Sequence, residues 1–175
     1  VSKRSGKAVT LTDLLDDIGT DATRFFFNLR QANTHFDFDM DLAVSKTNEN
    51  PVFYVQYAHA RICSIIANME EEGVKVADLT NEELANLNQP EEQALIRFIA
   101  KFPNEVNTSA REYDPSKMTR YCLELAGLFH KFYTVCRVKG TEESIMQSRL
   151  NLCKATKITL KNLLTMLKIN TPEKM

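Results

Sequence analysis

The sequence predicts an all-α protein built as an antiparallel helix bundle. Aliphatic residues recur at spacings of three and four through most of its 175 residues, which is the period of helices with one buried face. Glycine and proline, which interrupt helices, number only five each. Three of the glycines, Gly19, Gly73 and Gly140, fall between the periodic stretches. Because the connections between the longest stretches are short, neighbouring helices are expected to run antiparallel.

Two short helices are predicted at the start of the chain. The first covers 11–18 and ends at Gly19, because glycine is favoured just beyond a helix. The second is capped by Thr20 or Asp21, whose side-chain oxygens can accept from free backbone N–H groups, and it runs through Arg30.

An extended segment and a third short helix follow. Residues 35–40 alternate strictly between polar and apolar side chains, which is the period of extended backbone. An isolated strand has no partner, so this segment is expected to be a linker that packs Phe36 and Phe38 onto the bundle. A short helix is then predicted over about 41–47.

The strongest helix start signal is at Asn50 and Pro51. Asn50 suits the N-cap position and Pro51 suits the first helical position. This first long helix is predicted to run to Glu72 and to stop at Gly73. Its buried face is expected to consist of Val52, Val55, His59, Ile62, Ile66 and Met69.

Prolines mark the next helices. A short helix is predicted over 81–87, and a longer one begins at Pro90 and is kinked at Pro103, because proline removes a helical donor. Asp114 and Pro115 signal the start of another long helix. Its inward residues repeat in steps of four and three: Met118, Cys122, Leu125, Phe129, Phe132 and Cys136.

The last long helix is expected to close the bundle. Gly140 is predicted to end the helix before it, Thr141 to cap it, and residues 169–175 to form a tail. Its inward residues are predicted to be Met146, Leu150, Cys153, Leu160, Leu164 and Leu167.

Composition and charge limit the partners and the cellular compartment that the sequence predicts. The formal net charge is −1, so whole-chain charge does not by itself indicate a nucleic-acid partner. No stretch reaches the roughly 20 apolar residues of a membrane-spanning helix, so no membrane partner is expected. Residue 1 is not methionine, and the chain is expected to be a fragment. The cysteines form no CxxC pair, which favours reduced buried thiols and a cytoplasmic protein over a zinc site: Cys63, Cys122, Cys136 and Cys153.

The first long helix carries the best candidate binding residues. Tyr54, Tyr57 and Arg61 lie off its predicted buried face, and Gln56 beside them offers both a donor and an acceptor. Aromatic rings beside an arginine can stack unpaired bases and bind phosphate. Ala58 is small, so a base has room to approach the helix backbone. The alternative is that the tyrosines only flank the core.

A second candidate is a basic face on the last helix. Lys154, Lys157 and Lys161 step by three and four, so they share one face. They are expected to contact nucleic-acid phosphate, and the alternative is a plain solvated surface.

Only residues 1–9 have the character of an enzyme site. Lys3, Arg4 and Lys7 stand among small residues in a loop that can close over a polyphosphate, and the alternative is a disordered basic terminus. The sequence holds no Ser-His-Asp set, no HExxH, no P-loop and no GxGxxG.

Isolated histidines and aspartates do not indicate a metal site. His59 lies on a predicted buried face, and a core histidine is favoured over a base contact or a general base. Asp37, Asp39 and Asp41 alternate but lack the glycine and distal glutamate of a calcium loop, so no metal ligands are predicted.

Segments from both ends of the chain resemble one family, the bacterial-type arginyl-tRNA synthetases. Residues 2–7, Ser-Lys-Arg-x-Gly-Lys, resemble the Lys-Met-Ser-Lys-Ser-type loop of class I aminoacyl-tRNA synthetases. Residues 21–24, Asp-Ala-Thr-Arg, resemble the Asp-Ala-x-Arg motif that names their anticodon-binding domain. Similarity to the arginine enzymes in particular extends over 35–43, 48–61, 127–138 and Met175.

The resemblance implies a helical bundle of the class I anticodon-binding type, which docks the anticodon stem and loop of arginine tRNA. Residues 1–30 would hold the Lys-Met-Ser-Lys-Ser-like loop and connecting helices, and residues 31–175 the anticodon-binding domain. The candidate residues of the first and last long helices, together with Met175, would contact the tRNA.

The resemblance also implies an enzyme. The intact protein would ligate arginine to its tRNA with ATP and Mg, and Lys3, Arg4 and Lys7 would belong to an incomplete catalytic site. Val1 stands where the family loop commonly has methionine, and the Rossmann domain with its His-Ile-Gly-His signature is missing. The chain alone is therefore expected to bind no cofactor, to activate no arginine, and to work as a monomer with a missing N-terminal catalytic domain. The alternative is a non-catalytic helical module for protein–protein docking or structure.

Overall fold

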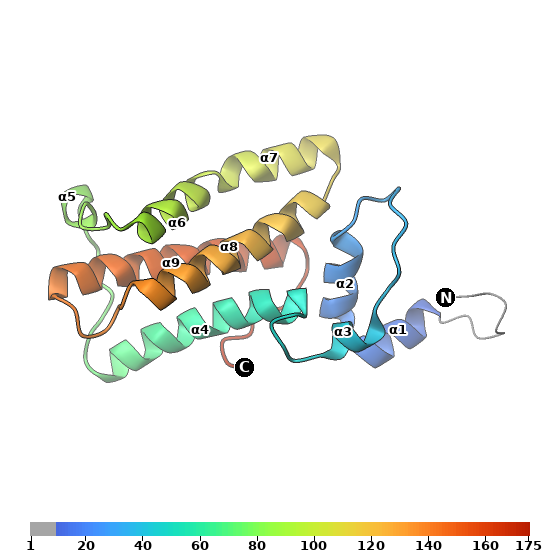
Figure 1. Ribbon diagram of the computed structural model, residues 1–175, viewed down its shortest axis with the longest axis horizontal. Coiled ribbons are helices and arrows are strands. Elements are labelled where there is room, and N and C mark those ends of the chain that lie inside the picture. Colours follow the sequence, from blue (N-terminus) through green and yellow to red (C-terminus); the bar gives the residue numbers. More distant parts are fainter. Residues whose placement is uncertain (1–9) are drawn as a thin grey trace.

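Long helices run side by side along the long axis of the molecule (Figure 1). The computed structural model describes residues 10–175, and every regular element in that range is helical, as the sequence predicts. The long rods are α4 (Pro51–Glu71), α8 (Ser116–Val135), α9 (Glu143–Met166), and a rod broken into α6 (Pro90–Ala100) and α7 (Phe102–Glu112).

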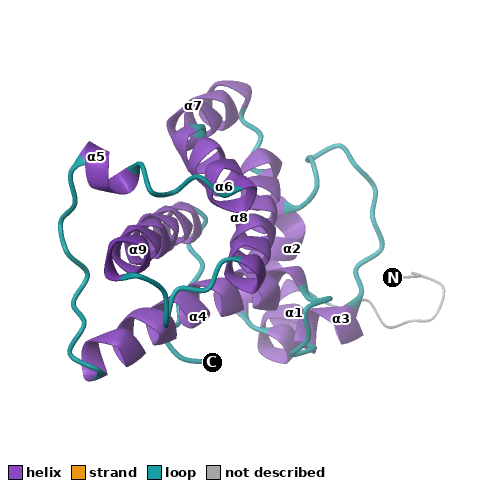
Figure 2. Cartoon of the chain, turned by 60° about the vertical axis from the view of Figure 1, so that its left-hand side comes forward, coloured by secondary structure: helices purple, strands orange, loops and turns teal. Residues whose placement is uncertain are grey.

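Short helices cover the two ends of the bundle (Figure 2). One end carries three of them, packed around the start of α4, and the other carries one. They are α1 (Leu11–Ile18), α2 (Thr20–Asn28), α3 (Met40–Val44) and, at the far end, α5 (Asn81–Leu84).

The segment before α3 is extended and pairs with no strand in the described range, as expected. Its two phenylalanines pack onto α2. The ring of Phe38 lies 5.3 Å from that of Phe26, and the ring of Phe36 meets Phe27 edge-on at 6.0 Å. Because Phe26 is buried in the main core, this linker extends the core instead of forming a separate layer.

Helix α8 lies at the centre of the bundle and contacts α4, α6, α7 and α9. Its sequence predicts an inward face in steps of four and three, and the structure confirms that face. Leu125, Phe129 and Phe132 are completely buried, and burial of large side chains such as these contributes about 1.5–3 kcal/mol each. The other predicted members, Met118, Cys122 and Cys136, are buried as well.

The start of α4 is fixed by Asn50. Its side-chain oxygen accepts from the Val52 N–H at 3.2 Å, so it caps the helix as predicted. Its side-chain nitrogen donates to the carbonyls of Ala43 and Ser45, at 3.1 and 2.8 Å. One buried amide therefore sets both the first turn of α4 and the path of the chain that leads into it.

The predicted boundary between α8 and α9 is wrong. Helix α8 ends at Val135 and not at Gly140, because the backbone turns extended at Cys136. This turn lets both Cys136 and Val138 point into the core, where they are 2% and 3% exposed. Helix α9 is preceded by Glu142, and Thr141 donates its hydroxyl to the Val138 carbonyl instead of capping the helix.

Other helix boundaries also differ from the prediction. Gly19 stands at the N-cap of α2 in place of Thr20 or Asp21, and α2 stops two residues before Arg30. Helix α3 begins earlier, because Asp39 accepts from the Leu42 N–H. Helix α5 ends at Leu84, and the rod around Pro103 is not one kinked helix but two, with Pro103 in the first turn of α7.

The predicted tail folds back across α4 (Figure 1). Ile169 is 4% exposed. Asn170 accepts at its carbonyl from the Gln56 amide at 3.0 Å, and the Pro172 carbonyl lies 3.0 Å from Nδ1 of His59. The tail is therefore held by polar contacts with α4 as well as by apolar burial.

All four cysteines are free and buried, as predicted. Burial raises the pKa of each thiol, and raises that of Cys153 to about 12. Within residues 10–175, no three His, Cys, Asp or Glu side chains gather where they could hold a metal ion. None of the helices in that range is long and apolar enough to cross a membrane.

A buried ion pair joins α6 to α9. The carboxylate of Glu92 is completely buried and accepts from Arg149 Nε at 2.7 Å, while its other oxygen accepts from the Gln89 N–H at 2.8 Å. The Arg149 guanidinium also donates to the Arg137 carbonyl. A buried carboxylate left without its partner is costly, so each member of this group depends on the other.

We expect Arg149→Met to lower the free energy of unfolding by about 3–5 kcal/mol, because it leaves the Glu92 carboxylate uncompensated in the core. Urea unfolding followed by circular dichroism measures the loss. The matched control is Arg97→Met on the exposed face of α6, which should change stability by about 0.5 kcal/mol or less. Equal effects of the two variants would show that the buried pair adds nothing.

His59 is a core histidine, 1% exposed, as the sequence favours. Its Nδ1–H donates to the Pro172 carbonyl, while its Nε2 is buried with no hydrogen-bond partner among the described residues. Burial lowers the pKa of His59, and Lys157 and Lys161 lower it further, against the opposing effects of the Pro172 carbonyl and Glu173. The imidazole is therefore neutral in the folded protein at pH 7.

We expect the fold to lose stability as the pH falls below about 6.5, the ordinary pKa of histidine. A pKa lowered by folding means that the unfolded chain binds the proton first, so this stabilisation is present above pH 6.5 and is lost as the pH falls through the folded-state pKa. The loss is at most about 1.4 kcal/mol per pH unit from this one group. His59→Asn, which cannot titrate, should show a smaller difference between pH 7.5 and 5.5 in urea unfolding. An unchanged pH dependence would contradict the assignment.

Candidate functional site

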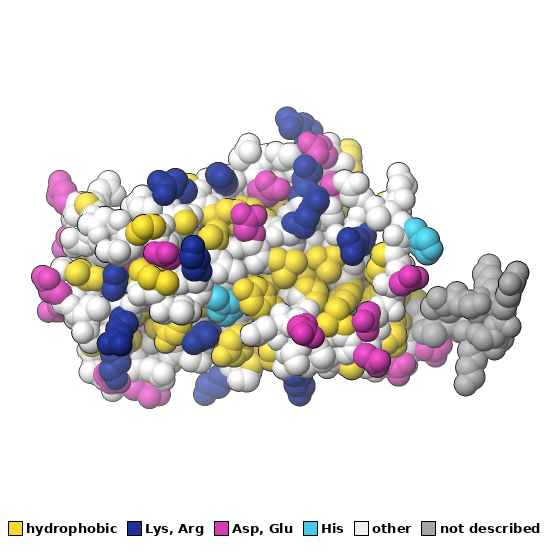
Figure 3. All heavy atoms as spheres, viewed as in Figure 1, with side chains coloured by type: hydrophobic (Ala, Val, Ile, Leu, Met, Phe, Trp, Pro, Cys, Tyr) yellow, Lys and Arg dark blue, Asp and Glu magenta, His cyan; other side chains and the backbone are white. Residues whose placement is uncertain are grey.

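Side chains from α4 and α8 form a continuous strip of stacked groups at the surface. Phe53, Tyr57 and Arg61 are four residues apart on α4, so they lie on one face of it. His130 and Tyr133 face them from α8. We call these five residues the aromatic strip. Figure 3 shows that the face of the molecule carrying α4 and α8 presents both hydrophobic and basic side chains.

Three rings of the strip, those of Phe53, Tyr57 and His130, lie nearly parallel to their neighbours. Those of Phe53 and Tyr57 are 6.1 Å apart with an interplanar angle of 5°, and those of Tyr57 and His130 are 6.0 Å apart at 24°. The guanidinium of Arg61 lies 4.6 Å above the Tyr133 ring and 5.8 Å from that of Tyr57. Arg61 is thus held over the aromatic surface by cation–π attraction.

His130 joins the strip to the tyrosine beneath it. The ring of Tyr54 lies 4.9 Å from His130. Burial lowers the pKa of His130, and the charge of Arg61 lowers it further, while the Tyr54 carbonyl opposes both. Nε2 of His130 is buried without a partner in the part of the chain that the structure describes. The ring is therefore a neutral, flat member of the stack at pH 7.

A groove of about 270 Å³ continues the strip beyond Tyr133. Its walls include Ile65 and Asn68 of α4 on one side. Arg137 and Lys139, from the turn after α8, lie on the other side. An aromatic wall, an amide and two cations are a set that suits an unpaired base with its phosphate.

The structure brings some of the predicted binding residues together. Tyr57 and Arg61 both belong to the strip, and Tyr54 lies half-buried behind His130. Ala58 is completely buried, so the expectation that a base approaches it is wrong: on this helix turn its methyl group faces the core.

Gln56 lies on a different side of α4. Its amide nitrogen donates to the Asp21 carboxylate and to the Asn170 carbonyl, each at 3.0 Å. The expectation of a free donor there is therefore corrected, because both N–H groups are used inside the protein and only the amide oxygen remains to meet a ligand. Met175 lies nearby, half-exposed, in a second groove that Phe53 and Gln56 also line.

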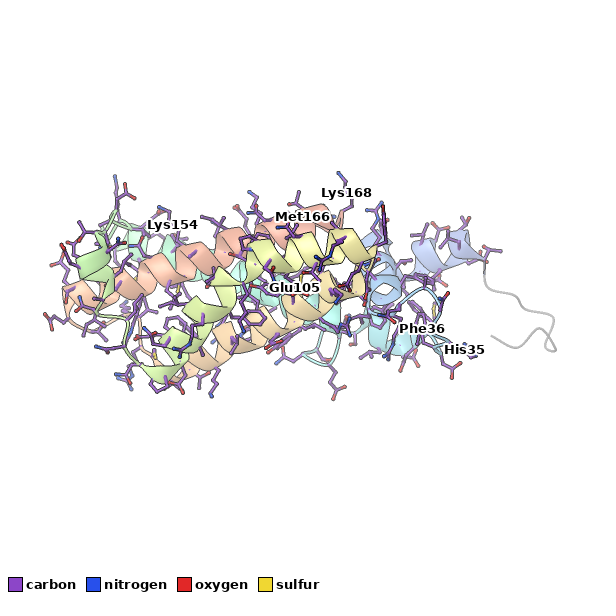
Figure 4. The ribbon with its side chains drawn as sticks, turned by 90° about the horizontal axis from the view of Figure 1, so that it is seen from above. His35, Phe36, Glu105, Lys154, Met166 and Lys168 are labelled. Atoms are coloured by element: carbon purple, nitrogen blue, oxygen red, sulfur yellow. The ribbon has the colours of Figure 1, made fainter. Side chains whose placement is uncertain are left out.

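The three lysines of α9 are apart from the strip. Lys154 lies toward the α5 end of α9 (Figure 4), 3.8 Å from the carboxylate of Asp78. Lys157 and Lys161 lie close enough to His59 to affect its pKa, on the α9 side of α4. A ligand that meets both these lysines and the strip must therefore wrap around α4. Lys3, Arg4 and Lys7 lie outside the described residues.

Sequence reasoning did not assign the α8 half of the site. His130 and Tyr133 lie within the segment 127–138 that resembles the arginine enzymes. The sequence predicts no role in a site for them, nor for Arg137 and Lys139. The available signal is their spacing: His130 and Tyr133 are three apart and lie next to the buried Phe129 and Phe132, which places them at the edge of the core.

Comparison with known proteins agrees with the helical fold. The model of the DALR anticodon binding domain family matches residues 55–175. The chain is 50% identical to an arginine–tRNA ligase of Acetivibrio thermocellus and 51% identical to that of Caldanaerobacter subterraneus, over all of its 175 residues in both cases. It spans 31% of the length of these two relatives.

A solved structure gives the same result. The arginyl-tRNA synthetase of Plasmodium falciparum superposes with a TM-score of 0.78 at 26% identity, covering 99% of this chain and 30% of that one. The family match covers most of the bundle, including α4 from its second turn and all of α8 and α9. This chain therefore belongs to the family of DALR anticodon-binding domains.

Proposed function

We propose that this chain is the tRNA-binding part of an arginine–tRNA ligase, and that it binds the anticodon loop of arginine tRNA along the aromatic strip. The observation that carries the proposal is the run of nearly parallel rings from Phe53 through Tyr57 to His130, joined to Tyr133 by Arg61 and continued by a cationic groove. The relatives that it matches along its whole length are arginine–tRNA ligases.

The geometry supports recognition of single-stranded bases. A loop base that leaves its stack needs a flat partner, and Tyr57 and neutral His130 supply faces that carry no charge to desolvate. Arg61 covers Tyr133, so a base at that position meets the guanidinium plane. Each stacked base contributes about 1–3 kcal/mol.

Phosphates are bound separately from bases in this proposal. Arg137 lies beside the groove, where it can neutralise the backbone next to a base held there. Lys139 can do the same when its ammonium exchanges the Glu72 carboxylate, its partner in the free chain, for a phosphate. The net charge of the chain is only −1, so this attraction comes from local clustering and not from the whole molecule.

The intact protein would ligate arginine to tRNA with ATP and Mg, with Lys3, Arg4 and Lys7 near the phosphates. The chain spans only 31% of the length of these ligases, and three cations alone cannot position arginine against ATP, so we propose that the chain by itself binds tRNA without activating arginine. We also propose that it works as a monomer in the cytoplasm. Its buried thiols support a reducing compartment.

We expect Tyr57→Ala to weaken binding of arginine tRNA about tenfold or more, because it removes the central ring of the strip. Tyr57→Phe keeps that ring and should bind within about twofold of the unaltered chain. Fluorescence anisotropy at a fixed salt concentration measures the affinity, and circular dichroism checks the fold.

The matched control for Tyr57→Ala is Tyr113→Ala. Tyr113 is 93% exposed at the end of α7 and belongs to neither the strip nor the groove. If Tyr57→Ala keeps full affinity, or if Tyr57→Ala and Tyr113→Ala lose the same amount of affinity for arginine tRNA, the stacking role of the strip is wrong. Binding by the unaltered chain to a tRNA for another amino acid tests specificity in the same assay.

Lys157 and Lys161 remain proposed phosphate contacts. We expect Lys157→Ala with Lys161→Ala to reduce the slope of log affinity against log salt by roughly one to two, and to act alike on every tRNA. The pair Lys101→Ala and Lys117→Ala makes the same change in net charge on the α7 and α8 side and should leave the slope unchanged. Equal slopes for all three proteins would make this lysine pair an ordinary solvated surface.

A further inference from the structure

Asp21 holds together three segments that are far apart in the sequence. It lies in the first turn of α2. One carboxylate oxygen accepts from the Gln56 amide of α4 at 3.0 Å. The other accepts from both the backbone and side-chain nitrogens of Asn170 in the tail, each at 3.2 Å.

Arg24, one turn further along α2, binds the chain where the same tail begins. Its guanidinium donates to the Lys168 carbonyl at 2.6 Å, where the chain leaves α9. Figure 4 shows Lys168 at the end of α9 beside the short helices. Lys168 has a φ of +58°, in the left-handed region, which redirects the chain toward α4. A cation beside the last carbonyls of a helix is also favoured by the helix dipole.

These contacts fix the orientation of Gln56. Its amide nitrogen faces a carboxylate and a carbonyl, both of which only accept hydrogen bonds. The side chain therefore has one satisfactory orientation, with its oxygen left for other partners. We call the group formed by Asp21, Arg24, Gln56 and Asn170 the tail clasp.

The tail clasp lies next to the first residue of the aromatic strip. Gln56 and Asp21 line the same groove as Phe53 and the terminal Met175. Farther along the tail, the Pro172 carbonyl accepts from His59. Without the clasp, the residues after Lys168 would keep one hydrogen bond to α4, from His59 to the Pro172 carbonyl, together with the burial of Ile169.

We propose that Asp21 and Arg24 are positioning residues for RNA binding, which hold the tail against α4 so that Gln56 and Met175 are already in place when RNA reaches the Phe53 end of the strip. This inference rests on the proposed function of the strip. Ordering the tail beforehand removes an entropy cost from the binding step, so the clasp increases affinity without its two charged residues touching RNA.

The test compares Asp21→Ala with Asp16→Ala, a control that removes an equal charge from the exposed face of α1. Amide hydrogen exchange measures the tail directly. We expect the Asn170 N–H, which donates to Asp21, to exchange at least tenfold faster in Asp21→Ala, while amides of α8 keep their rates. Binding of arginine tRNA should weaken about fivefold in Asp21→Ala and remain unchanged in Asp16→Ala.

Two conservative variants separate positioning from general loss of structure. Arg24→Lys keeps a cationic donor near the Lys168 carbonyl and should restore most of the affinity that Arg24→Ala loses. Gln56→Ala combined with Asp21→Ala should weaken binding less than the sum of the two single changes, because both act through one group.

The outcomes for the clasp and for the strip are distinguishable. If Asp21→Ala frees the tail but tRNA affinity is unchanged, the positioning role is overturned while the proposed function stands. If Asn170 exchange is unchanged, the clasp itself is wrong. If the unaltered chain binds no arginine tRNA, the proposed function fails, and the positioning role fails with it even where the tail exchange responds.

Discussion

Burial of one face of α8 is the interaction on which the rest of the molecule depends. Leu125, Phe129 and Phe132 are completely buried, and α8 contacts α4, α6, α7 and α9. His130 and Tyr133 each follow one of these phenylalanines in sequence. Their rings therefore stand at the margin of the core, at positions fixed by the packing of their neighbours. The proposed binding surface is an edge of the hydrophobic core. The close packing of that core therefore fixes the positions of the rings at the surface.

Much of the architecture could be predicted because its signals are local. The start of α4 depends on Asn50 and Pro51, whose preferences act within one turn, and the stripe of α8 depends on a regular period. The end of α8 could not be predicted in this way. Gly140 is a good local stop signal, but the chain leaves the helix four residues earlier because Cys136 and Val138 must both be buried. That requirement comes from packing against the surrounding helices, and the local sequence carries no signal of it.

The site shows the same division between local and distant causes. The face shared by Tyr57 and Arg61 follows from helix geometry, so the sequence alone predicts α4 as a binding helix. Its partners His130 and Tyr133 come from a segment more than seventy residues away, and only packing brings the two together. The error about Gln56 has a similar origin, since its donors are used by Asp21 and Asn170. The small size of Ala58 does not make it accessible, because small residues also serve close helix packing and Ala58 is completely buried.

The buried ion pair has a consequence for the groove. Arg149, paired with Glu92, also donates to the carbonyl of Arg137, and Val138 beside it is buried. The turn that carries Arg137 and Lys139 is thus anchored from inside, and it cannot open as a separate loop while the bundle remains intact. A cationic loop of this kind would ordinarily be adaptable and tolerant of many ligands. Here the backbone positions of Arg137 and Lys139 are set by the protein interior, while their side chains are exposed. Changes in the core can therefore alter ligand binding at a surface they never reach.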